Sequence, residues 1–323
     1  MTSLEYDLAF IAVAAAILIL QFVLGLFFNL VVLVASQRVL LTNQDHGQGN
    51  HFIQNLNIVD LILCVTAIPV TLVALFKSYF PHTLFCYFLE AIVAFVSVAS
   101  LMTLLMVTLD RYFAIVTPTR ERIITTKLNY FLILIWSLAV LSFCTPFFAL
   151  NKDSLSDVGV YYFSCNYVIN HNSPYYFYEL CYVLIFVITT VGMILFYVAI
   201  CRSASKHSNI ITAVMTVSGS LSEGTMTGYL QRKRDTKRLR VSKGIVITFA
   251  LLWGPHVVIT VIQMVVSDSI EISMAKIVCL LLAYTTTIVH PLMYAVIRRK
   301  IRDEIIKAWR RKVAPMPQME VGI

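Results

Sequence analysis

Several side chains that carry charge lie inside long apolar runs of this sequence. Asp60 lies in "NLNIVDLILCV", Glu90 in "FLEAIVAF", and His290 in "IVHPLMY", while Asp110 and Arg111 adjoin in "LDRYFAIV". In an apolar solvent such groups are costly, so they pair with one another, bind ions or take part in conformational switches. Their spacing therefore predicts internal polar sites.

The same residues do not form a pattern that is typical of catalysis. The sequence contains neither His-Glu-x-x-His nor Gly-x-Ser-x-Gly. Its seven histidines do not cluster with acids or cysteines at metal-ligand spacing. We therefore expect neither an enzyme nor a bound metal or other cofactor.

Elements that could position these groups are apolar helices. Of 323 residues, 59% are hydrophobic and only 13% are charged, too few charges for the surface of a soluble protein. Seven stretches are long enough to cross a bilayer, at roughly 20 residues each: 8–36, 51–76, 87–110, 129–150, 177–201, 242–266 and 276–297. The predicted fold class is an all-α membrane protein, a seven-transmembrane helix bundle. A transporter or a non-signalling scaffold is the alternative, but transporters often contain repeats, and the sequence shows none.

Lysine and arginine positions predict the orientation of the bundle. With the N-terminus outside, the extracellular side holds Lys77, Lys152 and Lys276, and the cytoplasmic side holds the other 22 of 25 (25 minus 3). The basic residues that give the chain its net charge of +8 are thus expected to face anionic lipid headgroups. This charge therefore does not indicate nucleic-acid binding.

The order of motifs resembles that of the rhodopsin-like, or class A, G-protein-coupled receptors over almost the whole chain. The residues that carry the resemblance are Asn29, Asp60, Cys86, Asp110-Arg111-Tyr112, Trp136, Trp253-x-Pro255 and His290-Pro291-x-x-Tyr294. "AYTTTIVHPLMYA" resembles a subgroup of orphan receptors related to the cholecystokinin receptors, because His290 precedes the proline where most of the family has Asn. The resemblance implies a plasma-membrane receptor for an extracellular ligand, or one active without a ligand, which couples to a heterotrimeric G protein.

This resemblance implies an activation switch at the cytoplasmic face. Asp110, or Asp235 at the inner end of the sixth span, is expected to hold Arg111, and opposite charges in a partly dehydrated cleft attract strongly. Release of Arg111 would let the sixth span swing outward. Asp235 might instead be a solvated acid in a basic run; the sequence leaves both readings open.

Further switch residues are implied in the last three spans. Pro255 and Pro291 each remove a helix hydrogen bond and kink their spans. Trp253, with Phe249 one turn inward, is expected to move at the first kink. The other switch positions implied are Tyr112, and Tyr294 with Tyr197 as its partner. An aromatic residue at helical spacing is also typical of a packed core.

A mid-membrane polar site is implied by the same resemblance, because family members commonly hold a sodium ion there. Its members would be Asn29, Asp60, Ser100, Thr286, Thr287 and His290. We expect His290 to take the place of sodium beside Asp60 and to make signalling sensitive to pH. Alternatively, the imidazole is a neutral polar substitute that packs in the core.

An outer pocket is expected for the ligand. Val93 stands where amine receptors carry an Asp, and Tyr284 stands where opsins carry their lysine, so neither ligand class is favoured. The expected pocket residues are Glu90, Val93, His256, Thr260, Gln263 and Tyr284. A peptide or a small molecule remains open. Cys86 and Cys165 both face the oxidising side and are expected to form a disulfide.

The chain is expected to divide into a receptor domain, 1–297, and a cytoplasmic segment, 298–323. Ile301, Ile305, Ile306 and Trp309 recur at helical spacing, which predicts a short amphipathic helix on the inner leaflet, with a disordered basic tail as the alternative. The third intracellular loop, about 202–241, is rich in Ser and Thr, whereas 298–323 has none. Phosphorylation for arrestin binding would therefore fall in this loop.

Overall fold

The computed structural model describes residues 6–41, 49–76, 83–116, 127–148, 174–218, 223–266, 269–297 and 299–313. Within these ranges the chain forms α1 (Leu8–Leu41), α2 (Gly49–Val65), α3 (Ala67–Phe76), α4 (Thr83–Ile115), α6 (Leu128–Phe148), α7 (Pro174–Ser218), α8 (Glu223–Val265), α9 (Ile270–Tyr284), α10 (Thr286–Ile297) and α11 (Arg299–Val313).

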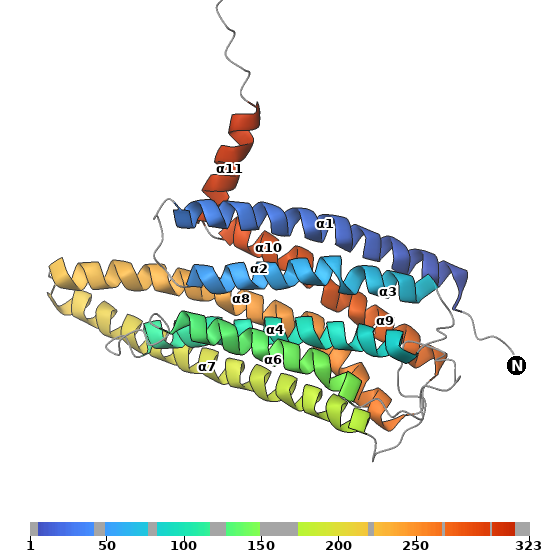
Figure 1. Ribbon diagram of the computed structural model, residues 1–323. Helices are drawn as coiled ribbons and strands as arrows, with labels where there is room; N and C mark the ends of the chain where they lie inside the picture. Colours follow the sequence, from blue (N-terminus) through green and yellow to red (C-terminus); the bar gives the residue numbers. More distant parts are fainter. Residues whose placement is uncertain are drawn as a thin grey trace, which may run out of the picture.

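Seven membrane-length apolar spans run along one common direction (Figure 1). Five of them are single helices, and the pairs α2–α3 and α9–α10 each make one span. The prediction of a seven-span, all-α bundle is confirmed.

Proline explains the interruption between α2 and α3 at Thr66. Pro69 has no backbone N–H, so the carbonyl of Val65 lacks its usual helical donor. On both sides of the gap the helical pattern continues, because Thr66 N donates to Ile62 O at 2.9 Å and Val70 N donates to Thr66 O at 3.1 Å. The span therefore crosses the bilayer with a local irregularity and without a loop.

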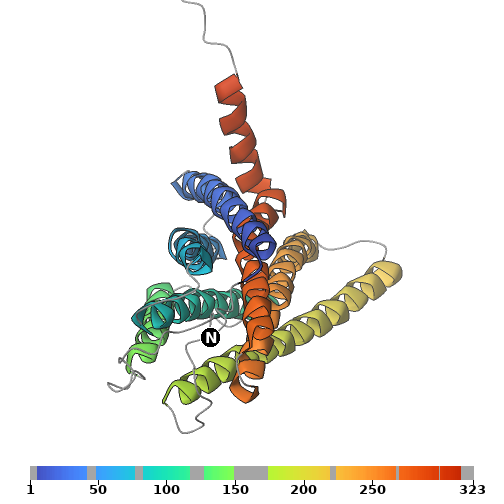
Figure 2. The ribbon, with the colours of Figure 1, turned by 90° about the vertical axis from the view of Figure 1, so that its right-hand side faces the viewer.

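Several polar side chains are buried inside this bundle, and many large apolar side chains are exposed on its outside. Asn29, Asp60 and His290 are almost completely buried, whereas Leu141 and Ile188 are more than 60% exposed. This distribution fits an apolar solvent, in which buried polar groups pair with one another and apolar groups meet lipid. The end-on view places α4 among α2, α6, α7 and α8 (Figure 2).

Helices α7 and α8 extend well past the other spans at one end of the bundle (Figure 1). They contain 45 and 43 residues, about twice the length that a bilayer requires. Within the segment predicted as the third intracellular loop, 202–241, the described residues 202–218 and 223–241 are helical, and 219–222 lie outside the described residues. Residues 202–218 contain neither Gly nor Pro, so nothing in them ends the helix.

Helix α11 leaves the same end of the bundle at a steep angle to the spans (Figure 1). Ile301 is 3% exposed and packs against the core, whereas Ile306 and Trp309 are 42% and 73% exposed. The amphipathic helix expected after the last span therefore occurs, and Trp309 is free to contact lipid headgroups.

Candidate switch and ligand sites

His290 and Asp60 meet in the middle of the bundle. His290 Nδ1 of α10 lies 3.1 Å from Asp60 Oδ2 of α2. The two residues are 0% and 2% exposed, so solvent does not screen the contact. The Nε2 atom on the other side of the ring is buried without a hydrogen-bond partner among the described residues.

Asn29 joins α1 to the last span. Its Nδ2 donates to Gly25 O at 2.9 Å and to Thr287 O at 2.7 Å. The Thr287 carbonyl is available because Pro291, four residues later, has no N–H to donate to it. A carbonyl released by a proline within a membrane helix thus gains a donor from a neighbouring helix.

The mid-membrane residues do not fit a sodium site as they are arranged. A hard cation is held by several converging oxygen atoms. Here an imidazole nitrogen already contacts the Asp60 carboxylate. The hydroxyls of Thr286 and Thr287 donate to carbonyls of their own span, at 2.7 and 2.8 Å. Ser100 is buried on α4.

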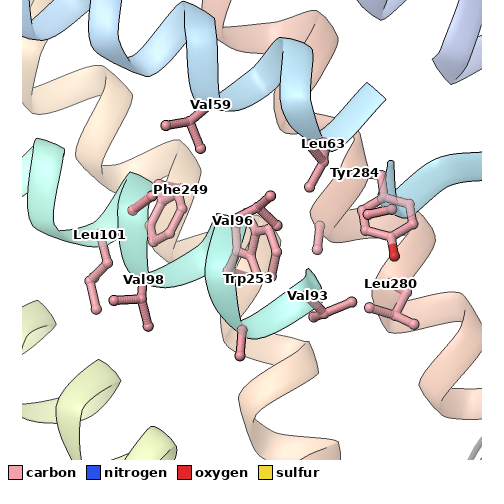
Figure 3. Close-up of a cluster of buried hydrophobic side chains, with 14 of the residues drawn as sticks. Val59, Leu63, Val93, Val96, Val98, Leu101, Phe249, Trp253, Leu280 and Tyr284 are labelled. Atoms are coloured by element: carbon pink, nitrogen blue, oxygen red, sulfur yellow. The ribbon is translucent and has the colours of Figure 1, made fainter. Parts of the chain in front are cut away.

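A stack of rings extends from His290 toward the outer half of α8. Phe249 lies between two partners, with its ring centroid 6.4 Å from His290 and 5.8 Å from Trp253. The interplanar angles are 21° and 27°, so the rings are nearly parallel. Trp253 and Phe249 are both buried, and Figure 3 draws them in one cluster of buried side chains with Val96 of α4. The aromatic residues expected at the switch thus form part of the core and also contact the polar centre.

The outer half of the bundle contains an ion pair that the sequence analysis missed. Lys276 Nζ of α9 contacts Glu90 Oε1 of α4, with the two side chains only 4% and 15% exposed. Lys276, which the prediction placed at the very start of the seventh span, lies more than one turn inside α9. Ser269 caps the helix by accepting from Ile272 N at 3.3 Å, and a Ser followed by Glu271 was the available signal for a start near residue 270.

Other residues expected in the outer pocket lie on the same inner surface. Val93 and Tyr284 belong to one cluster of buried side chains, with Leu280 near both (Figure 3). The Tyr284 hydroxyl makes a 2.8 Å hydrogen bond with Thr71 Oγ1. His256, Thr260 and Gln263 are all buried, at 2%, 5% and 6% exposure.

Arg111 pairs with its neighbour Asp110 at the inner end of α4. Arg111 Nη2 lies 2.6 Å from Asp110 Oδ2, and both side chains are at most 10% exposed. Tyr112 packs its ring 5.2 Å from that of Phe196 on α7. Asp235 belongs to α8, but its side chain lies outside the described part of the chain.

Close packing joins α8 to α10 near this inner end. Thr248 Oγ1 lies 3.5 Å from Met293 Sδ. A Cβ added to Gly244 would lie 2.7 Å from Met293 Cε, so the small residue admits the methionine. Tyr197 and Tyr294 are buried at 6% and 1% exposure. The two helices are therefore in contact on the side of His290 toward the C-terminal end of α10.

The expected disulfide cannot be placed in this structure. Cys165 and the side chain of Cys86 lie outside the described residues. Five other cysteines are free thiols: Cys64, Cys144, Cys181, Cys201 and Cys279.

Comparison with known proteins agrees with this architecture. The sequence matches the family described as 7 transmembrane receptor (rhodopsin family) over residues 28–294. The chain belongs to this family and is therefore a receptor and not an enzyme, and coupling to G proteins is the family's general mechanism. The family predicted from the order of motifs is confirmed.

Among particular relatives, the chain is 27% identical to G-protein coupled receptor 22 of Homo sapiens, over 98% of this chain and 83% of that protein. It is 23% identical to the QRFP-like peptide receptor of Branchiostoma floridae, over 90% and 75% of the two chains. The thyrotropin-releasing hormone receptor of Gallus gallus is 25% identical, over 86% and 74%.

Proposed function

We propose that this chain carries an extracellular stimulus, or its own thermal activation, across the plasma membrane through a two-state change of the bundle. In one state α8 packs on α10 at the inner end. In the other state the helices separate, and a helix of a heterotrimeric G protein enters the groove between them. Family membership supports the G-protein partner.

One observation carries this proposal: α8 and α10 are joined at two depths by neighbouring contacts. Phe249 stacks on His290, and Met293, one turn further along α10, packs against Thr248, the residue next to Phe249. Since Trp253 stacks on Phe249 and lies beside the proline kink, a movement of Trp253 acts on both contacts together.

Arg111 is the proposed cytoplasmic switch. Its buried pairing with Asp110 is short, and its Nε has no hydrogen-bond partner among the described residues. In the proposed active state Arg111 leaves this pair, and Tyr197 and Tyr294 stabilise the open inner face. Asp235 remains a second proposed partner on the strength of the sequence, and Asp235→Ala is expected to raise basal signalling.

The proposed N-terminus is extracellular. The excess of Lys and Arg in the predicted inner segments supports this orientation. The N-terminal end of α1 and helix α11 lie at opposite ends of the bundle (Figure 1), as the proposal requires. Two relatives are named for a peptide and a hormone, which favours a peptide or a small molecule as the ligand here. Arrestin is proposed to bind the segment between the fifth and sixth spans, where Ser and Thr are frequent.

The test is ligand-free G-protein activation in cells, with wild type compared with Arg111→Ala at matched surface expression across a panel of G-protein subtypes. A basal signal in one subtype that disappears in the variant supports the proposal and identifies the transducer. Lys307→Ala, which removes an exposed cation of α11, is the matched control and is expected to keep the signal. An equal signal in wild type and Arg111→Ala would contradict the role of Arg111, and silence in every subtype would favour a ligand-dependent receptor or a scaffold.

A further inference from the structure

The seventh span is interrupted at Thr285, between α9 and α10. Thr285 N donates to Leu282 O, three residues back, at 3.1 Å, whereas a regular α-helix would use Leu281 O, four residues back. A single tight turn of this kind within a helix often marks a hinge. Pro291 does not explain the turn, because the carbonyl that it leaves free is that of Thr287. The turn at Thr285, here called the joint, is therefore a separate irregularity of this span.

Gln21 of α1 reaches the joint from outside the span. Its Nε2 donates to Leu281 O at 2.7 Å and to Thr285 Oγ1 at 3.1 Å. Thr285 Oγ1 in turn donates to Leu281 O at 3.0 Å, so two donors meet at the carbonyl that the tight turn has released. Gln21 is 4% exposed, and its Oε1 has no hydrogen-bond partner among the described residues. A buried amide that is half satisfied is costly, so what this side chain stabilises is the joint that its nitrogen contacts.

The joint separates two halves of the span that are held by different helices. On the α9 side, Lys276 contacts Glu90 of α4. On the α10 side, His290 contacts Asp60 of α2, and Met293 contacts α8. Because each half has partners of its own, a change of angle at the joint moves α10 against α8 and leaves the outer ion pair in place. Figure 1 shows α9 and α10 following one another along the bundle, with α10 beside α1.

We propose that Gln21 is a positioning residue of the receptor switch: it fixes the angle between α9 and α10 and thereby keeps His290 and Met293 packed on α8. When the bond to Leu281 O is lost, α10 turns at the joint, and the closed inner end of the bundle becomes less favourable. Gln21 acts through the seventh span and not by touching a ligand or a G protein. This inference rests on the proposed receptor function, because the joint serves the same two-state change of the bundle.

Amide hydrogen exchange of the purified full-length receptor, without ligand or G protein, tests whether Gln21 holds the joint. Gln21→Met keeps the size of the side chain and removes its donor. Ile288 N and Val289 N both donate to Thr285 O at 3.0 Å, so their exchange reports opening of the joint. We expect both amides to exchange about two- to tenfold faster in Gln21→Met, as the loss of one hydrogen bond implies. Unchanged exchange would overturn the proposal.

Gln54→Met is the matched control. Gln54 of α2 also donates through its Nε2 to another helix, at 3.3 Å to Ser36 Oγ of α1, but it does not contact the joint. This variant should leave the exchange of Ile288 and Val289 at the wild-type rate. Equally fast exchange in both methionine variants would indicate a general loss of stability and would refute a specific role for Gln21.

Substitutions at Thr285 cover the case in which Gln21→Met does not fold. Thr285→Val keeps the shape of the side chain and removes the hydroxyl that accepts from Gln21, so it should also speed exchange at the joint. Thr285→Ser retains the hydroxyl and should exchange at the wild-type rate. Equal rates in these two variants would contradict the proposed contact.

Ligand-free nucleotide exchange on the G protein connects the joint to signalling. Gln21→Met should raise the basal rate per folded receptor by about two- to tenfold, and Gln54→Met should not. Faster amide exchange together with an unchanged basal rate would make Gln21 a structural residue only and would overturn its role in the switch. Since amide exchange needs no G protein, a wild type without nucleotide exchange would count against the proposed function, while the amide measurement still decides whether Gln21 holds the joint.

Discussion

Replacement of His290 by Asn tests whether the imidazole takes the position of sodium beside Asp60. In the structure His290 Nδ1 lies 3.1 Å from the carboxylate, and both residues are at most 2% exposed. An Asn side chain is shorter than the ring and brings a carbonyl oxygen in place of a ring nitrogen. We therefore expect His290→Asn to bind sodium at Asp60, and wild type not to bind it.

The expected magnitudes follow from the burial of the pair. In potassium chloride the variant loses a buried hydrogen-bond partner of Asp60, which lowers the free energy of unfolding by about 1–3 kcal/mol. Sodium at about ten times its dissociation constant restores about 1.4 kcal/mol. For a chain of this size, that restoration corresponds to a rise of about 2 °C in the unfolding midpoint.

The assay is thermal unfolding of the purified receptor in sodium chloride and in potassium chloride at equal ionic strength. His290→Asn should be more stable in sodium, and wild type should be equally stable in both salts. Addition of Asp60→Asn to the variant should remove its sodium response. The reasoning is refuted if wild type already responds to sodium, or if the variant does not.

Three further substitutions test contacts that the bundle makes. Gly25→Ala should lower the free energy of unfolding by about 1–3 kcal/mol in a denaturation assay, because its Cβ would lie 2.7 Å from side-chain atoms of two other helices. A Cβ added at Gly192 would have no atom within 4 Å, so Gly192→Ala should have little effect in the same assay. Trp136→Phe should cost about 1 kcal/mol in chemical unfolding, since it loses a 3.1 Å hydrogen bond to Asn55; no change would mean that the bond contributes nothing. Tyr284→Phe should lower the free energy of unfolding by a similar amount, because it loses a 2.8 Å hydrogen bond to Thr71. An unchanged thermal midpoint would contradict this.

The sequence predicted the spans because each depends on the composition of a continuous segment. Apolar runs longer than about 20 residues identified all seven spans, although several ends differ by some residues. The seventh span begins at Ile270, six residues before the predicted start. That shift alone moves Lys276 from the first residue of the span to a position inside it, where its side chain is buried. The predicted end of the fifth span and the predicted start of the sixth span were also wrong. Helices α7 and α8 continue into polar segments, which a search for apolar runs does not detect.

The depth of each polar residue within its span was also predictable from the sequence. Residues at the same depth were therefore expected to lie close together. Asp60 and His290 both lie near the middle of their spans, so a contact between them was expected, and the structure brings them to 3.1 Å. The bond from Asn29 to Thr287 O was not expected. Pro291 showed which carbonyl would be free, but the sequence did not indicate which donor would reach it.

By itself, the sequence determined that the protein lies in a membrane, how many spans it has, where its prolines fall and which family its motifs belong to. These properties are local, because hydrophobicity and backbone chemistry act within a single segment. Only the tertiary structure decided that Lys276 meets Glu90, that Phe249 stacks between Trp253 and His290, and that α8 packs on α10. Such pairings depend on the rotation and depth of each helix, which the packing of the whole bundle sets.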